Sequence, residues 1–204
     1  MRKIQMMFAV LILMGASLNS CNYMTTATDS SSDSIASEVP DIGISVGASD
    51  IEAIEQYLVS EIGKNYAEAE YCVPLLRIVN KEEQEDGEIL VWGGYCVFNY
   101  NLVGDTLKCV SGGSHPGLMH VCLADDNLSF VVTAFEQVED GAGNLESAKR
   151  IFGDKYENYK DLCSDVEGRE MDRADRLAYY VETHNLPATM YQDYGWPARQ
   201  LPKY

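Results

Sequence analysis

The sequence predicts an α+β fold in which one helix precedes an antiparallel sheet and further helices follow it. Three observations support this fold class. A helix start signal stands near residue 50, the middle of the chain holds short runs rich in Val, Tyr, Phe and Cys, and helical spacing of apolar residues returns near the C-terminus. The links between the middle runs are too short for the crossovers of a parallel sheet, so a meander is expected.

The first helix is predicted by its start, its stripe and its end. Ser49-Asp50-Ile51-Glu52 is a capping box, in which the serine and the glutamate satisfy free amides of the first turn. Gly63 is expected to end the helix. One apolar face follows from the spacing of Ile51, Ile54, Leu58 and Ile62.

About five strands are expected next, because β-branched and aromatic residues alternate with turn residues. The segments are 71–79, 88–100, 106–111, 118–124 and 128–138. We interpret residues 112–117 as a long hairpin loop, in which glycines adopt positive φ and Pro116 fixes a turn.

Helices are predicted after the sheet, and they should pack on one of its faces. Asn144 can cap a helix that ends at Gly153, and residues 155–163 form a second short one. Ser164-Asp165-Val166-Glu167 is another capping box, which opens a helix to about His184. Its apolar stripe consists of Met171, Ala174, Leu177, Ala178 and Val181.

The N-terminus has the order of a secretory signal: a basic start at Arg2-Lys3, an apolar run over 6–14, and small residues up to Cys21. The run is too short to span a membrane. Leu18-Asn19-Ser20-Cys21 resembles the lipobox of bacterial lipoproteins, although Asn19 replaces the usual small residue. The resemblance implies that residues 1–20 are removed and that Cys21 is acylated, for example with palmitate. An uncleaved anchor or plain secretion are the alternatives, and both place the domain outside the cytoplasm.

Residues 21–48 are predicted to be a flexible acidic tether, and 49–204 a single α+β domain. The segment 22–48 is rich in Ser and Thr and contains no Lys or Arg. The whole chain has 32 acidic and 15 basic residues and a net charge of -17, which repels nucleic-acid backbones. The protein is expected to contact a membrane only through lipid at Cys21. That membrane is the cell membrane or the outer membrane, and the domain faces the periplasm or the exterior.

Two further resemblances concern the domain. One helix followed by a curved sheet and helices resembles in outline the cystatin-like and NTF2-like folds, although NTF2-like proteins place most helices before the sheet. The stretch from Tyr100 to Gly117, together with the ending Tyr191 to Trp196, resembles an uncharacterised group of lipoproteins from gut-type anaerobic bacteria. Neither resemblance implies a function.

Five cysteines remain if Cys21 is acylated: Cys72, Cys96, Cys109, Cys122 and Cys163. An odd number leaves at least one thiol unpaired. Folding segment 106–111 onto 118–124 would place Cys109 level with Cys122, close enough for a disulfide. The alternative, five buried free thiols, is favoured because a slip of one residue separates the pair.

The same segments allow a zinc site and a hydrolase site, but neither is favoured. His120 and Cys122 share a strand face, with His115 or Cys109 as a further ligand, yet no Cys-x-x-Cys or His-Glu-x-x-His motif supports zinc. We therefore expect no metal or cofactor. Ser114 and His115 lie in a glycine-rich loop, but neighbouring side chains diverge and the Gly-x-Ser-x-Gly turn is absent. A small hydrolase that uses Ser114, His115 and His120 remains the alternative function.

Aromatic residues indicate where a pocket would form. Tyr191, Tyr194 and Trp196 belong to a tail without helical periodicity, and Trp92 precedes two glycines in the longest strand segment. We expect a pocket between segment 88–100, residues 112–117 and the tail. Its candidate residues are Trp92, Ser114, His115, His120, Tyr191, Tyr194 and Trp196. The favoured function is a non-catalytic domain that binds an unknown small molecule or protein.

Overall fold

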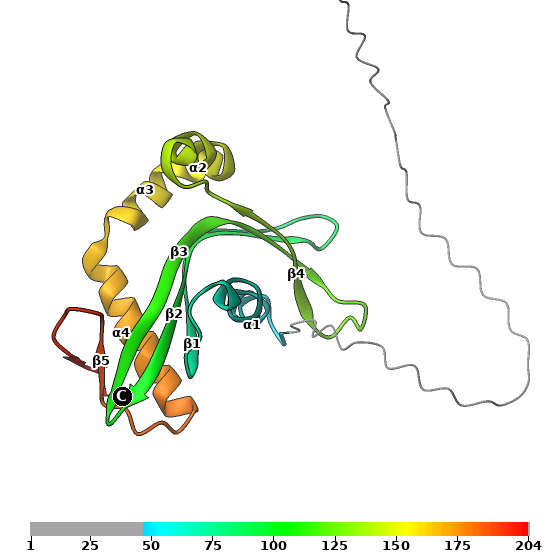
Figure 1. The fold of residues 1–204 in the computed structure, drawn as a ribbon. Helices are drawn as coiled ribbons and strands as arrows, with labels where there is room; N and C mark the ends of the chain where they lie inside the picture. Colours follow the sequence, from blue (N-terminus) through cyan, green and yellow to red (C-terminus); the bar gives the residue numbers. More distant parts are fainter. Residues whose placement is uncertain (1–46, 204) are drawn as a thin grey trace, which may run out of the picture. The chain divides into compact units, whose positions relative to one another are not determined.

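The computed structural model describes residues 47–203, so the predicted signal peptide, Cys21 and the tether up to residue 46 lie outside the described residues. Gly47 already belongs to the fold, because it exchanges backbone hydrogen bonds with Phe130. The α+β prediction is confirmed: a helix comes first, a curled and mostly antiparallel sheet follows, and further helices pack on that sheet (Figure 1).

Helix α1 (Asp50–Tyr57) begins where the capping box predicts. The Glu52 amide donates to the Ser49 hydroxyl at 3.2 Å, and the Glu52 carboxylate accepts from the Ala48 amide at 2.9 Å. The helix continues through a π-helical turn, Leu58–Ile62, and a 3-10 turn, Gly63–Asn65. Its apolar face is buried against the sheet.

The sheet is a meander extended by a short tail. Strands β1 (Tyr71–Glu83), β2 (Ile89–Val103), β3 (Thr106–Leu123) and β4 (Phe130–Gln137) pair antiparallel in chain order. Strand β5 (Met190–Gln192) runs parallel to the start of β3, and β6 (Arg199–Gln200) pairs with β5. The sheet curls around α1 (Figure 1).

Residues 112–117 do not form the predicted loop, because β3 runs without interruption from Thr106 to Leu123. The glycines of this segment are absent from the residues with positive φ. Glycine is required there by close approach instead: a Cβ on Gly112 would lie 2.5 Å from the Val97 carbonyl oxygen, and one on Gly113 would collide with the Tyr66 hydroxyl. The glycines that indicate a turn in the sequence are therefore needed because neighbouring atoms approach this strand closely.

The continuous strand also excludes a disulfide between Cys109 and Cys122, which the sequence allows as the less favoured alternative. Both residues lie on β3, one near each end. A strand advances about 3.3 Å per residue, whereas disulfide-bonded residues have Cα atoms about 6 Å apart. All five cysteines of the described region are free thiols, as favoured, but of these only Cys96 is buried and Cys163 is exposed, so the expected burial of all five is wrong.

The outer edge of β3 is only partly paired. Strand β5 pairs with residues 106–108 and β4 pairs with residues 117–123. Between these two contacts, no described strand pairs with the outer edge of β3. Pro116 lies in this interval, where its missing amide leaves no ladder hydrogen bond unmade.

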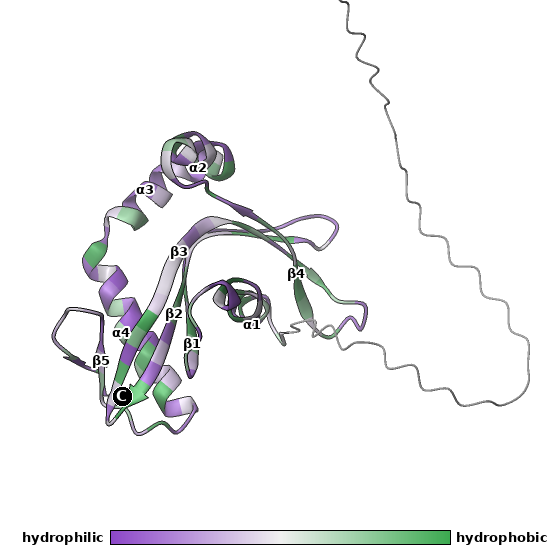
Figure 2. Ribbon diagram, in the orientation of Figure 1, coloured by the Kyte–Doolittle hydropathy of each residue, from purple (hydrophilic) through white to green (hydrophobic). Residues whose placement is uncertain are grey.

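Three helices follow the meander. They are α2 (Asn144–Phe152), α3 (Tyr156–Ser164) and α4 (Val166–Thr183). Two predicted caps are wrong by one residue: Asn144 is already helical, and α4 is capped by Asp165, which accepts from the Gly168 amide at 3.0 Å. Helix α4 alternates hydrophilic and hydrophobic residues along its length (Figure 2).

The described residues belong to one compact unit with a core on each face of the sheet. The α1 face is apolar and consists of Ala53, Ile54, Leu58, Ile89, Val91, Tyr95, Val97, Met119 and Val121. On the opposite face, α4 and the tail pack on the sheet in a cluster that consists of Val73, Tyr100, Leu107, Leu177, Ala178, Ala188, Tyr191 and Leu201. Helices α2 and α3 cover a third cluster around Trp92 and Phe152.

Candidate functional site

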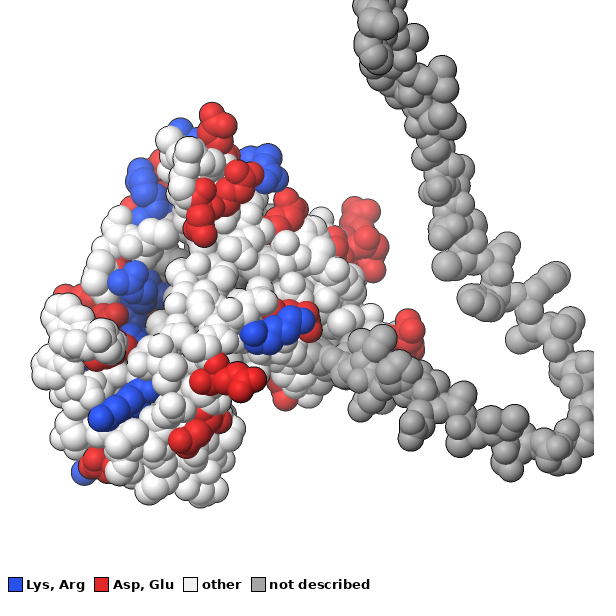
Figure 3. Space-filling view, viewed as in Figure 1, with Lys and Arg blue, Asp and Glu red and all other residues white. Residues whose placement is uncertain are grey.

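A cavity of about 410 Å³ lies between the face of β2 and β3 opposite α1 and the first half of α4. We call it the α4 cleft. A hollow that holds basic side chains, with acidic ones beside them, separates α4 from the sheet in Figure 3. The cleft is lined by Cys96, Phe98, Cys109, Val110, Ser111, Gly112, Gly113, Ser114, Arg169, Glu170, Arg173 and Tyr194.

A second hollow, the tail pocket, adjoins the cleft at Glu170. It has a volume of about 290 Å³ and lies between α4 and the C-terminal tail. Its lining residues are Val166, Glu170, Tyr191, Asp193, Trp196, Pro197 and Arg199. The two hollows make one region with both aromatic and charged walls.

Arg173 holds the floor of this region together. Its guanidinium is 6% exposed, donates to the Tyr100 hydroxyl at 2.7 and 2.9 Å, and forms a two-pronged pair with Asp193 at 2.5 and 2.8 Å. It also stacks over the Phe98 ring, 4.0 Å from the centroid. Burial alone would lower the pKa of Arg173, but the hydrogen bonds that it donates to Asp193 and Tyr100 outweigh burial and raise the pKa, so the guanidinium stays charged.

The same ion pair fixes the loop that rims the cleft. After Asp193 the chain forms a β-turn in which the Trp196 amide donates to the Asp193 carbonyl at 3.1 Å. Gly195 occupies the third position with φ 76°, which favours glycine. The turn leaves the rings of Tyr194 and Trp196 96% and 65% exposed at the mouths of the two hollows.

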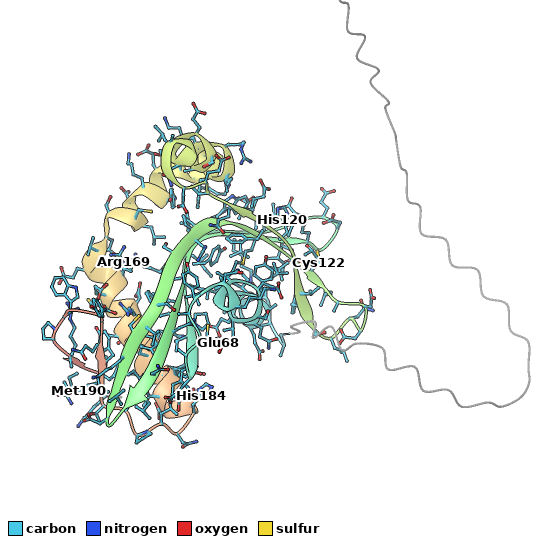
Figure 4. The ribbon with its side chains drawn as sticks, in the orientation of Figure 1. Glu68, His120, Cys122, Arg169, His184 and Met190 are labelled. Carbon is cyan, nitrogen blue, oxygen red and sulfur yellow. The ribbon has the colours of Figure 1, made fainter. Side chains whose placement is uncertain are left out.

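Arg169 supplies the free charge of the cleft. Glu170 pairs with Arg199 at 3.3 Å and Arg173 pairs with Asp193, but Arg169 forms no ion pair with any described carboxylate. It lies between α4 and β3 in Figure 4.

The two thiols of the cleft are held in their neutral form. Burial raises the pKa of Cys96, although the Ser114 hydrogen bond and the charges of Arg169 and Arg173 oppose this rise. Burial also raises the pKa of Cys109. A neutral thiol is a weak nucleophile, so burial lowers the reactivity of both cysteines.

The structure brings four of the seven predicted pocket residues to this region. Ser114 and Tyr194 line the α4 cleft, and Tyr191 and Trp196 line the tail pocket. Tyr191 also belongs to the buried core, so the tail both completes the core and rims a hollow.

The other three predicted residues lie elsewhere. Trp92 is buried under α2, where its indole donates to the Ile151 carbonyl at 2.9 Å. His115 lies on the opposite face of β3 from Ser114 and contacts the Tyr66 hydroxyl at 2.8 Å. His120 lies far along the sheet from Arg169, between Glu88 at 2.9 Å and Glu136 at 3.3 Å (Figure 4). The structure therefore does not bring Ser114, His115 and His120 together.

Sequence reasoning missed Arg169 and Arg173. Arg169, Arg173 and Leu177 follow one another at intervals of four residues, so they lie on the same face of α4. The two arginines therefore continue the apolar stripe toward the N-terminus of the helix. A cation in such a stripe is the signal that could have identified them, since charged residues are buried only when they are paired.

Comparisons with known proteins do not assign the chain to a family. No protein-family model matches the sequence, and neither a curated protein nor a solved structure matches it significantly. Within residues 47–203, no His, Cys, Asp and Glu side chains cluster as a metal site would require. No helix in this range has the length and hydropathy of a membrane span.

Proposed function

We propose that this protein is a lipid-anchored cell-envelope lipoprotein whose folded domain binds a small molecule without transforming it. The observation that carries the proposal is the α4 cleft: a cavity of about 410 Å³ with aromatic walls and a few charged groups. Such a composition is typical of ligand sites. The lipobox at Cys21 supports the anchor, and export places the domain on the periplasmic or exterior side of a membrane.

The chemistry of the cleft favours binding over catalysis. A serine nucleophile needs a base within hydrogen-bond reach, and none of the described lining residues is a histidine. His115 faces the other side of the sheet from Ser114. The neutral thiols of Cys96 and Cys109 are poor nucleophiles as well.

The cleft can be tested by filling it. Val110 lines the cleft and is 44% exposed, so Val110→Trp should occlude the cavity and leave the core intact. Val103→Trp is the matched control, because Val103 is 52% exposed at the end of β2 and lies outside the cleft lining. The full chain in non-ionic detergent is screened with small metabolites by thermal shift.

Compounds that raise the melting temperature of the wild type should lose this effect in Val110→Trp and keep it in Val103→Trp. A further readout is the alkylation rate of Cys109, which bound compounds should lower, while exposed Cys163 provides the internal control. Stabilisation that survives in Val110→Trp would place the binding site elsewhere.

The anchor is tested by detergent-phase partitioning and intact mass. The wild type should enter the detergent phase with a mass that matches residues 21–204 plus acyl chains. Cys21→Ser should leave the detergent phase, whereas Cys163→Ser, which removes an exposed thiol of the domain, should not. Partitioning of Cys21→Ser into detergent would contradict the lipid anchor.

A further inference from the structure

The α4 cleft carries one positive charge that the protein does not compensate. Its charged groups are Arg169, Glu170 and Arg173. Glu170 pairs with Arg199 and Arg173 pairs with Asp193, so both are neutralised locally. Arg169 is the charge that remains, because no described carboxylate pairs with it.

This excess charge is unexpected in so acidic a chain. The sequence holds 32 acidic residues against 15 basic ones, so carboxylates are plentiful. The cations at the corresponding position of the next turns are both paired: Arg173 with Asp193 and Arg176 with Glu55. An arginine left without a partner beside a cavity can receive an anion, and its planar fork suits a carboxylate.

The other lining residues of the cleft indicate the chemistry of the rest of the ligand. The Phe98 ring and the Val110 side chain are apolar, and the exposed Tyr194 ring stands at the mouth. Ser114 adds a hydroxyl on the same wall. Aromatic and apolar walls favour an apolar body, particularly a ring that can stack.

We propose that the α4 cleft binds a small organic carboxylate that carries an apolar or aromatic body. Arg169 binds the carboxylate, and Phe98, Val110 and Tyr194 surround the body. This inference rests on the proposed function of the cleft as a binding site and names the class of ligand. The volume of about 410 Å³ lies at the lower end of the usual range for ligand sites, which fits one ring with a short acidic side chain.

The test compares an acid with its neutral amide in the full chain, purified in non-ionic detergent. Phenylacetate and phenylacetamide are titrated by calorimetry, with inorganic phosphate as a third probe. Phenylacetate should bind about tenfold to a hundredfold more tightly than phenylacetamide, because a hydrogen-bonded charge pair is lost in the amide. Inorganic phosphate should bind much more weakly, since it has no apolar body.

Two variants assign the effect to Arg169. Arg169→Gln should weaken phenylacetate binding by about tenfold or more and leave phenylacetamide binding unchanged. Lys108→Gln is the matched control, because Lys108 is an exposed cation of β3 outside the cleft lining. It should change either affinity by less than about twofold, since the charge of an exposed side chain outside the cleft lining is screened by water and salt. Melting temperatures confirm that both variants are folded.

Three results would overturn the inference: equal affinity for acid and amide, unchanged phenylacetate binding in Arg169→Gln, or phosphate binding as tight as that of phenylacetate. Absence of phenylacetate binding at millimolar concentration would overturn it too. The proposed function is judged separately, by whether any compound of the metabolite screen loses its effect in Val110→Trp. A neutral compound that stabilises the wild type but not Val110→Trp would support binding in the cleft. It would contradict the proposal that the ligand is a carboxylate.

Discussion

The two faces of the sheet are built by different physical means. On the α1 face, apolar side chains such as Leu58, Val97 and Met119 are fully buried against one another. On the α4 face, the charged side chain of Arg173 is also buried, with 6% of it exposed, within a network of Asp193 and Tyr100, and a cavity opens beside it. One sheet therefore supports both a closed apolar core and an open polar cleft.

The difference shows how a small domain can keep a cavity open. Apolar contacts have no preferred direction, so the side chains of the cluster between α1 and the sheet close on one another. Hydrogen bonds have fixed lengths and angles, so the Arg173 network holds α4 and the tail at a set distance from the sheet. We infer that the polar network is the part of the fold that preserves the cleft.

The largest effect is expected from Arg173→Ala. This change leaves Asp193 and the buried Tyr100 hydroxyl without their partner and should lower the free energy of unfolding by about 3–5 kcal/mol. Arg176→Ala is the matched control on the same helix. Arg176 is 22% exposed and pairs with Glu55, so Arg176→Ala should lower the free energy of unfolding by about 1 kcal/mol. Denaturant unfolding measures both, and equal losses would contradict the special role of Arg173.

Leu58→Ala probes the apolar face and should have the next largest effect. Leu58 is fully buried in the turn that extends α1, and its truncation leaves a cavity. We expect a loss of about 3 kcal/mol in the free energy of unfolding. Val59→Ala, one residue later and 38% exposed, should lose less than about 1 kcal/mol. Similar losses in both variants would mean that this turn is not part of the core.

The α1 face could largely be predicted from the sequence, because its information is local. Ser49, Glu52 and the spacing of Ile54 and Leu58 define the start and the buried side of α1 within a few residues. The α+β class and the mostly antiparallel sheet followed from similar local patterns and from short links, but segments 106–111 and 118–124, expected as two paired strands, form the single strand β3.

The α4 face could not be predicted in the same way, because its information is spread along the chain. Arg173 meets Tyr100 across 73 positions and Asp193 across 20. Gly112 and Gly113 have the sequence pattern of turn residues, whereas their actual constraint, close contact with Val97 and Tyr66, arises only in the folded sheet. The structure therefore brings Ser114 and the three predicted tail residues to one region and places the two histidines and Trp92 elsewhere.

Tyr95→Phe tests the polar interaction that lies within the apolar face. The Tyr95 hydroxyl is buried and donates to the Val91 carbonyl at 2.7 Å. Removal of one hydrogen bond should lower the free energy of unfolding by about 1 kcal/mol, well below the loss expected for Arg173→Ala. Tyr194→Phe is the control, because its ring is 96% exposed, and it should leave stability unchanged. A loss in Tyr95→Phe as large as that in Arg173→Ala would erase the contrast between the two faces.

The smallest effect is a change in pH dependence at the start of α4. The Gly168 amide and then Arg77 hold the pKa of Asp165 below its ordinary value of 3.8. A carboxyl whose pKa is lowered by folding stabilises the protein above its ordinary pKa, and this contribution is lost as the pH falls through the lowered value. Acid should therefore weaken the attachment of α4 to the sheet through Arg77.

Asp165→Asn separates the charge from the cap. Asparagine is as good a helix cap as aspartate, but it does not titrate and cannot pair with Arg77 as an ion. The variant should be slightly less stable than the wild type near neutral pH, and the two stabilities should converge as the pH falls below about 4. Asp175→Asn, which changes an aspartate of α4 whose side chain makes no hydrogen bond or ion pair with the described residues, should follow the wild-type curve. If Asp165→Asn also follows that curve in parallel, the charge of Asp165 does not help to hold α4 in place.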